Sequence, residues 1–310
     1  MIYTRKQKLK KHVLLLSLCV LNSLYSQTTL VRIQKDLSTI TKTKKSRNYQ
    51  HVKTLNSVAN YIKTELNKVC DSVGYQTYIV NNTEYKNVIG SIGLKNKERI
   101  VIGAHYDVCG TSEGADDNAS GVAGLLELAR LLSKEKLQYR IDFVAYTLEE
   151  PPFFRTEKMG SYIHASYIKE HQIPLKGMIC LESIGYFNKQ ENSQKFPVKG
   201  MEKIYGTKGN FITVVQNNKN GAFSTQITHL MKQQKLIDTK SFKGSSELSG
   251  VDFSDHLNYW KFNYDAVMIT NTAFYRNTNY HTPKDQLKTL DLEKMSLVIE
   301  QLYRTIKKLK

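Results

Sequence analysis

The feature that most constrains the fold is the stretch from Arg99 to Leu132, RIVIGAHYDVCGTSEGADDNASGVAGLLELARLL. It begins with an apolar, β-branched run over 99–104, which is typical of a buried strand. From Gly121 onward, apolar residues recur with a period of about 3.6, which predicts a helix buried along one face. The connecting loop carries one imidazole, that of His105, and four carboxylates: Asp107, Glu113, Asp116 and Asp117. A strand that enters a helix through such a loop predicts an α/β sheet with a ligand site at its carboxyl edge.

The rest of the chain continues to alternate between strand and helix patterns. Strands are expected at 75–80, 87–92, 140–147, 177–182, 211–216 and 266–270, and helices at 48–71, 160–170, 223–235 and from Asp291 onward. Asn188–Asn210 is expected to be a surface loop and Ser241–Ser254 a mobile one. With no internal repeat and no linker, the pattern predicts one α/β domain over 27–310, a mixed and mostly parallel sheet with helices on both faces.

The first 26 residues predict an export signal. A basic region with Arg5 and several lysines precedes an apolar core over 13–21, which is too short to span a bilayer as a mature helix. Cleavage is expected near Ser26–Gln27, giving an exported protein, periplasmic or extracellular, without stable membrane insertion. A lipoprotein signal at Cys19 and an uncleaved anchor remain the alternatives.

Net charge and cysteine content argue against a nucleic-acid-binding protein and against a small disulfide-rich fold. The formal charge of the 310-residue chain is +17, but its lysines are scattered and no aromatic nucleic-acid motif accompanies them. This pattern indicates a solvated lysine-rich surface rather than a nucleic-acid partner. The mature chain keeps the odd set Cys70, Cys109 and Cys180, which implies no dense disulfide framework. Cys109 is expected to be a small buried hydrophobe, because no other cysteine stands at ligand spacing from it.

Ionisable residues accumulate where the predicted strands end. They are His105, Asp107, Asp117, Glu149, Glu150, Glu182 and His281. Asp117 alone would be read as a helix cap, but Glu149 and Glu150 end an apolar strand side by side, and a cation is the simplest compensation for their repulsion. Imidazole with carboxylates suits zinc, and two such sets that share one carboxylate suit a pair of ions.

Five short motifs resemble the secreted di-zinc aminopeptidase family, whose relatives include glutamate carboxypeptidases and animal-type glutaminyl cyclases. The motifs are HYD at 105–107, GADDNASG at 114–121, EE at 149–150, SDH at 254–256 and YHTPKD at 280–285. They occur in order and at compatible spacing within the region from Asn48 to the C-terminus. The resemblance implies the zinc-exopeptidase fold, and a cis peptide bond between Asp117 and Asn118.

The resemblance also implies a role for each motif residue. His105 would bind one zinc ion, Glu150 and His281 the other, and Asp117 would bridge the two. Glu149 would be the general base, and Tyr280 would polarise the substrate carbonyl. Asp107 would orient the His105 ring, and Asp255 and His256 are expected just outside the ligands. Glu182 stands where the family commonly has Asp, and it is assigned to the first zinc because Glu is a competent ligand.

The function implied by the resemblance is hydrolysis of the first peptide bond of a peptide with a free N-terminus. Two Zn²⁺ ions would share a hydroxide, with Glu149 as the base. Two alternatives stay open: a glutaminyl cyclase that uses a single zinc, and a non-catalytic exported binding domain. Phe153, Phe154 and the Phe274–Tyr275 pair would either line an apolar substrate pocket or belong to the core.

Overall fold

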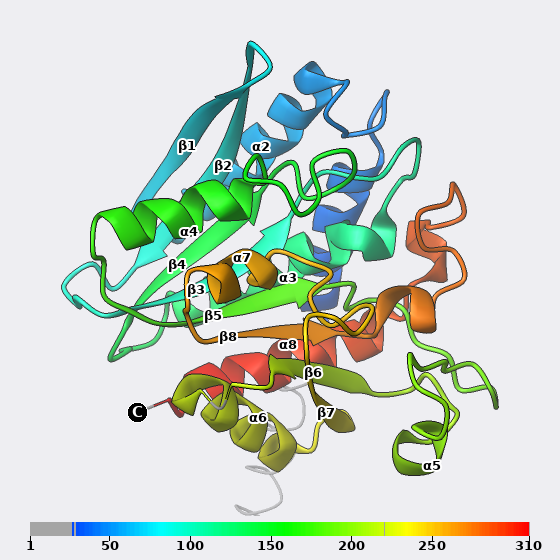
Figure 1. Ribbon diagram of the computed structural model, residues 1–310. Coiled ribbons are helices and arrows are strands. Elements are labelled where there is room, and N and C mark those ends of the chain that lie inside the picture. The colour runs from blue at the N-terminus through cyan, green and yellow to red at the C-terminus, as the bar shows by residue number, and fades with distance from the viewer. Residues whose placement is uncertain (1–26, 28, 220, 310) are drawn as a thin grey trace, which may run out of the picture.

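Eight strands form one mixed sheet at the centre of the structure, a computed structural model that describes residues 27, 29–219 and 221–309 (Figure 1). The order across the sheet is β1-β2-β4-β3-β5-β8-β6-β7. The strands are β1 (Ser72–Val80), β2 (Thr83–Ile92), β3 (Arg99–His105), β4 (Arg140–Tyr146), β5 (Leu175–Glu182), β6 (Ile212–Asn217), β7 (Thr239–Gly244) and β8 (Ala266–Thr270). The four central strands β4, β3, β5 and β8 run parallel, while β2 and β6 are antiparallel to their inner neighbours. The predicted α/β class is therefore confirmed.

Helices cover both faces of this sheet. One face carries α2 (Val52–Leu66), α3 (Gly121–Leu132), α6 (Ala222–Gln234), α8 (Leu292–Ile306) and the helical residues 29–41. The other face carries α4 (Gly160–Glu170) and α7 (His256–Lys261). A short helix, α5 (Glu202–Tyr205), lies in the long connection between β5 and β6.

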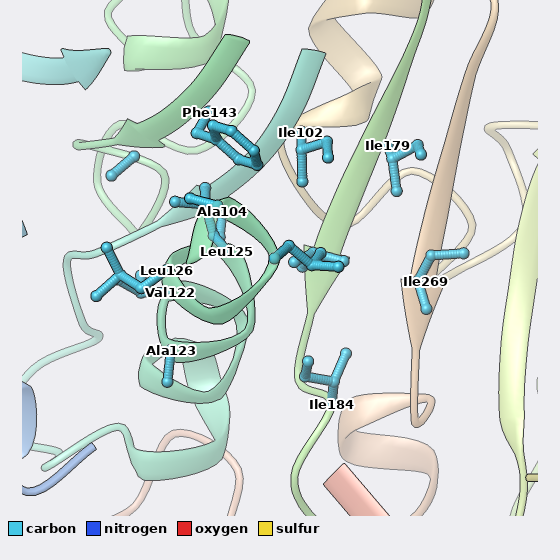
Figure 2. Close-up of a cluster of buried hydrophobic side chains, with 14 of the residues drawn as sticks. Ile102, Ala104, Val122, Ala123, Leu125, Leu126, Phe143, Ile179, Ile184 and Ile269 are labelled. Atoms are coloured by element: carbon cyan, nitrogen blue, oxygen red, sulfur yellow. The ribbon is translucent and has the colours of Figure 1, made fainter. Parts of the chain in front are cut away.

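The two faces follow from the alternation of side chains along the strands. In β3, Ile100 and Ile102 belong to the larger apolar cluster, whereas Val101 belongs to the smaller cluster on the opposite face. Figure 2 shows Val122 and Leu125 of α3 packed beneath Ile102 and its neighbours from the adjacent strands. Each such side chain stabilises the folded state by about 1.5–3 kcal/mol when it is fully buried. The packed centre of the sheet therefore holds the strand ends, and the residues on them, in fixed positions.

Several predicted elements differ from those observed. The supposed mobile loop from Ser241 begins inside β7, which pairs in parallel with β6. Its sequence TKSFKG has little apolar character because β7 is an edge strand with much of its surface accessible. The helix over 29–41 was not predicted, although Ile33 and Leu37 are buried at helical spacing. The predicted last helix does start after Asp291, whose side chain accepts a hydrogen bond from the Lys294 N–H.

The expected export signal over 1–26 lies outside the described residues. Within the part of the chain that the structure describes, no helix combines the length and apolar character needed to cross a bilayer.

Candidate metal centre

The polar residues singled out in the sequence gather at one edge of the sheet. His105 is the last residue of β3 and Glu182 the last of β5, while Glu149 and Glu150 follow β4. Because these strands are parallel and adjacent, their carboxyl ends lie together. His281, from the segment after β8, reaches the same place, within 3.1 Å of Glu150.

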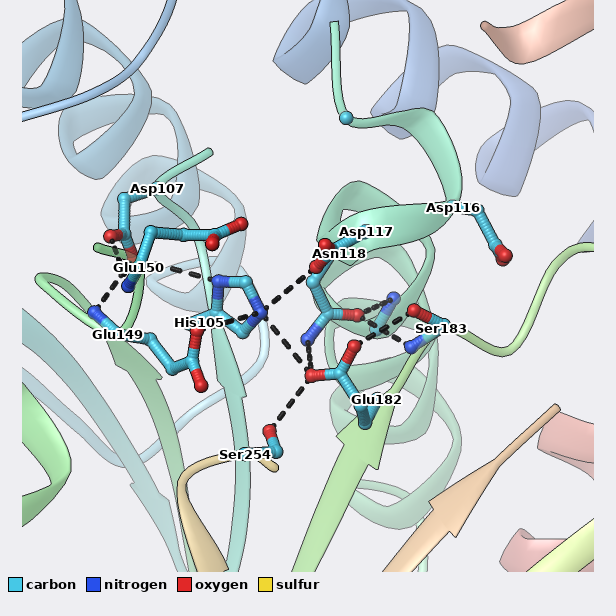
Figure 3. A network of polar contacts seen from close by, with 12 residues as sticks. His105, Asp107, Asp116, Asp117, Asn118, Glu149, Glu150, Glu182, Ser183 and Ser254 are labelled. Atoms are coloured by element: carbon cyan, nitrogen blue, oxygen red, sulfur yellow. Dashed lines mark hydrogen bonds and ion pairs between the residues drawn. The ribbon is translucent and has the colours of Figure 1, made fainter. Parts of the chain in front are cut away.

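Asp117 lies between the two histidines. Its Oδ1 is 3.2 Å from Nε2 of His105, and its Oδ2 is 3.0 Å from Nε2 of His281. Glu182 completes the first set, with Oε2 also 3.2 Å from the His105 nitrogen (Figure 3). Glu150 completes the second, with Oε2 3.1 Å from the His281 nitrogen. Two groups, each of one imidazole and two carboxylates, therefore share one aspartate.

The donor atoms of these groups fit small divalent cations. The Asp117 Oδ2, Glu150 Oε1 and His281 Nε2 atoms are buried without a hydrogen-bond partner, although ionic neighbours lie close by. A buried polar atom left without a partner costs about 1–3 kcal/mol, and coordination to a cation removes that cost. One nitrogen and two or three carboxylate oxygens are ligands that zinc accepts.

The charges at the site are unbalanced. Burial raises the pKa of Glu150 to about 7, and the charge of Asp117 adds to this effect. Burial also raises the pKa of Glu149 well above its usual value, with a further contribution from Glu150. Burial opposes ionisation of Asp117 as well, but its two histidine neighbours outweigh burial and lower its pKa. Four buried carboxylates facing two imidazoles leave an excess of negative charge that divalent cations would neutralise.

Asp107 and Ser254 support the ligands from outside. The Asp107 carboxylate accepts hydrogen bonds from the backbone N–H groups of Glu149 and Glu150 at 3.3 and 3.1 Å. Its Oδ1 is also 3.5 Å from Nδ1 of His105. On the opposite side, the Ser254 hydroxyl donates to Oε2 of Glu182 at 2.8 Å (Figure 3). The Asp107 contacts join the segments that follow β3 and β4, and the Ser254 contact joins the end of β5 to the segment before α7.

The loop that carries Asp117 is anchored by Asp285 and Asp116, two residues of the motifs that have no predicted role. Asp285 accepts hydrogen bonds from the N–H groups of Asp116 and Asp117 at 2.9 and 3.0 Å. Asp116 points away from His105 in Figure 3, and its carboxylate accepts from the Asn277 side chain. The expected cis peptide bond after Asp117 is present.

Arg47 also holds the segment over 106–114, which leads to Asp117, through hydrogen bonds to its backbone. Its buried guanidinium donates to the carbonyl oxygens of Tyr106, Glu113 and Gly114. Burial lowers the pKa of Arg47 to about 10, against the opposing effect of nearby carboxylates such as Asp285. Arg47 stands far upstream of every motif, so no local pattern marks it.

The remaining predicted residues occupy different positions. Asp255 is fully buried, and burial raises its pKa to about 7 against the opposing charge of His105. Nε2 of His256 is 2.8 Å from the Val251 carbonyl oxygen, so this ring supports the preceding loop. The Tyr280 ring stacks on His281 with ring centroids 3.8 Å apart. Their proposed roles remain predictions.

Two cavities open onto the site. One, of about 340 Å³, is lined by Glu149, Glu150, Pro151, Phe154, Ser249, Phe253, Phe274, Tyr280 and His281. A smaller one of about 70 Å³ reaches Glu182 and is walled largely by apolar side chains, Tyr275 among them. Phe153 instead packs edge-on against Tyr49, with centroids 5.4 Å apart, and belongs to the core.

Comparison with known sequences gives two findings. The sequence profile of peptidase family M28 matches residues 87–306. The chain is 39% identical to the uncharacterized protein YfbL of Escherichia coli strain K12, over 87% of this chain and 85% of that protein.

Among solved structures, the fold is similar to the LapA aminopeptidase of Legionella pneumophila, with a TM-score of 0.70, 20% identity, and coverage of 93% of this chain and 76% of that one. It is also similar to the glutaminyl cyclase of Bacteroides thetaiotaomicron, with a TM-score of 0.65, 18% identity, and coverage of 92% and 98%.

Proposed function

The chain belongs to peptidase family M28, and we propose that it is an exported, zinc-dependent aminopeptidase that removes single residues from free N-termini of peptides. The observation that carries this proposal is the position of Asp117, with one carboxylate oxygen toward His105 and the other toward His281. That arrangement provides for two ions a few ångströms apart, the spacing used by two-metal aminopeptidases.

Five residues would hold the ions. His105 and Glu182 would bind one, Glu150 and His281 the other, and Asp117 both. Bound zinc ions lower the pKa of coordinated water and stabilise negative charge that develops on a carbonyl oxygen. The assignment of Glu182 to the first ion is supported by its distance from His105: its Oε2 is 3.2 Å from the His105 Nε2, as is the Asp117 Oδ1.

Glu149 would transfer the proton. Its carboxylate is 3.8 Å from the His105 ring, and the residue also lines the cavity of about 340 Å³, so it faces both the metal ligands and the space for substrate. From this position it would take a proton from the attacking water and return it to the leaving amine. Asp107 holds the Glu149 backbone in place for both transfers.

Substrate selection would depend on the free amine. The buried carboxylates of the site favour a cationic or hydrogen-bonding amino group, and an acetylated terminus would leave them unpaired in a desolvated pocket. The Tyr280 hydroxyl would donate a hydrogen bond to the carbonyl oxygen of the bond being cleaved. The aromatic lining, with Phe154 and Phe274, favours a large apolar first residue.

The test is to incubate the purified, zinc-loaded protein with three peptides: a free leucyl peptide, its N-acetylated twin and an N-terminal glutaminyl peptide. The proposal expects stepwise release of single residues from the first peptide and no reaction of the second. Cleavage of the acetylated twin at internal bonds would contradict it.

Glutaminyl cyclisation is the second candidate, because the fold is also shared by a glutaminyl cyclase. A cyclase needs one zinc ion, whereas this chain places a second imidazole–carboxylate set, Glu150 and His281, beside Asp117. This second set favours hydrolysis. Pyroglutamate formation from the glutaminyl peptide, without hydrolysis of the leucyl peptide, would decide for the cyclase.

A further inference from the structure

Cys109 lies beside the second half of the metal centre. Its Sγ, one carboxylate oxygen of Glu150 and one ring nitrogen of His281 all lie within 4.8 Å of one another. The thiol is free and half-buried, so the expectation of a buried hydrophobe is wrong. Neither the strand pattern nor the family resemblance gave this cysteine a role.

The neighbours of Cys109 independently point to a bound cation. Glu150 is only 4% exposed, yet its Oε1 has no hydrogen-bond partner, and the same holds for Nε2 of the adjacent His281. The His281 nitrogen and Oε2 of Glu150 are 3.1 Å apart. Two ligands of one tetrahedral zinc ion are separated by about 3.3 Å, so this pair is already spaced for coordination.

We propose that Cys109 is an additional ligand of the ion held by Asp117, Glu150 and His281, so that this ion would have four protein ligands and would take water as a fifth. The inference rests on the proposed function, because it requires that ion. Sulfur and nitrogen ligands of tetrahedral zinc lie about 3.6 Å apart. Because Sγ is at most 4.8 Å from the nitrogen, it must approach by about 1.2 Å at most, and rotation about the Cys109 Cα–Cβ bond supplies such a movement. On coordination the thiol releases its proton to solvent, and the thiolate forms the bond to the ion.

A sulfur ligand would make the two halves of the centre chemically different. The set of His105, Asp117 and Glu182 offers only nitrogen and oxygen, whereas the set around His281 would add a thiolate. Thiolates favour soft and borderline metals over hard ones such as magnesium and manganese. The ion beside Cys109 would therefore be the more thiophilic of the two, and an electrophile that modifies the thiol would weaken its binding.

Cobalt provides the direct test, because a thiolate bound to Co²⁺ gives an intense near-ultraviolet charge-transfer band that nitrogen and oxygen ligands do not give. The metal-free full-length protein is titrated with Co²⁺, and binding is followed separately by the weaker visible d–d bands. We expect the charge-transfer band in the wild type, its loss in Cys109→Ser, and its retention in Cys70→Ser. Cys70 is the matched control, since it is also free and half-buried.

Alkylation gives a second readout that is independent of spectroscopy. Zinc should slow the reaction of Cys109 with iodoacetamide at least tenfold, and leave the rate at Cys70 unchanged, as peptide mass spectrometry of both sites would show. Two cobalt ions bound without a sulfur band, or a band that persists in Cys109→Ser, would overturn this inference and leave the proposed function intact. A protein that binds neither cobalt nor zinc would overturn both.

Discussion

The carboxylate of Asp285 accepts a hydrogen bond from the backbone N–H of Asp117 at 3.0 Å, across 168 residues of sequence. It accepts a second one from the preceding N–H, that of Asp116. The backbone that carries the Asp117 carboxylate is therefore held by a residue that is not itself among the proposed ligands.

Replacement of Asp285 by Ala should loosen the metal centre. Two backbone donors would lose their acceptor, and changes at residues that hold ligands in place typically cost 10–100-fold in metal affinity. We expect a loss of that size in zinc affinity, measured by competition with a chelator. Asp291→Ala is the control, because Asp291 caps α8: it should lower the free energy of unfolding by about 1 kcal/mol and leave zinc affinity unchanged.

Gly114→Ala should be far more damaging than Gly110→Ala. Both glycines have positive φ, +58° and +53°. An alanine in this left-handed conformation lowers the free energy of unfolding by about 1–2 kcal/mol at either position. A Cβ at Gly114 would also lie 2.3 Å from the Asp117 carbonyl oxygen, whereas nothing lies within 4 Å at Gly110. Overpacking adds about 1–3 kcal/mol. Urea unfolding of both variants gives the comparison, and equal losses of stability would contradict the tight fit at Gly114.

Substitutions of the adjacent residues Glu149 and Glu150 should have different effects on turnover and on metal content. Glu149→Gln removes proton transfer, so we expect kcat to fall about 10²–10⁴-fold while the bound zinc is retained. Glu150→Gln should lose one of the two ions. Metal analysis and turnover measured on the same samples test both expectations, and variants with the same metal content and the same activity would show that the roles are wrongly assigned.

Stability should fall in mild acid because of His164. This ring is buried against the Tyr259 hydroxyl, 2.6 Å from Nδ1, and burial lowers its pKa from 6.5 to about 4. Below pH 6.5 the His164 ring is protonated in the unfolded chain but stays neutral in the folded chain. The contribution of His164 to the free energy of unfolding is therefore fully present above pH 6.5 and is lost as the pH falls toward 4. The loss reaches about 3 kcal/mol at pH 4.

Urea unfolding of the chelator-treated protein at a series of pH values measures this slope. His164→Gln should flatten it, while His229→Gln, a change on the exposed surface of α6, should not. A variant of His164 with the wild-type slope would contradict the assignment.

The sequence predicted the centre of the fold and the strand-end residues well, because strong local signals mark both. The apolar run into His105 and the acidic pair after β4 place their side chains at one sheet edge once the strands are parallel. Arg47 and Asp285 could not be assigned in this way, since each acts through hydrogen bonds to a distant backbone segment. Such contacts leave no periodicity and no spacing in the sequence.

Weak local signals explain the other differences. The edge strand β7 lacks the apolar run of a central strand, so its sequence pattern predicts a loop instead. Cys109 has no other cysteine at ligand spacing in the sequence, and its actual neighbours, Glu150 and His281, come from distant parts of the chain. In both cases the decisive partner is defined only by the tertiary structure.

The metal content of the purified protein tests the central claim most directly. After zinc loading and removal of free metal, inductively coupled plasma mass spectrometry should find about two zinc ions per chain, as expected for a shared two-metal centre. The content should fall to about one in His281→Ala and close to none in Asp117→Ala. A wild-type protein that retains a single ion, and keeps it when His281 is replaced, would contradict the two-ion account.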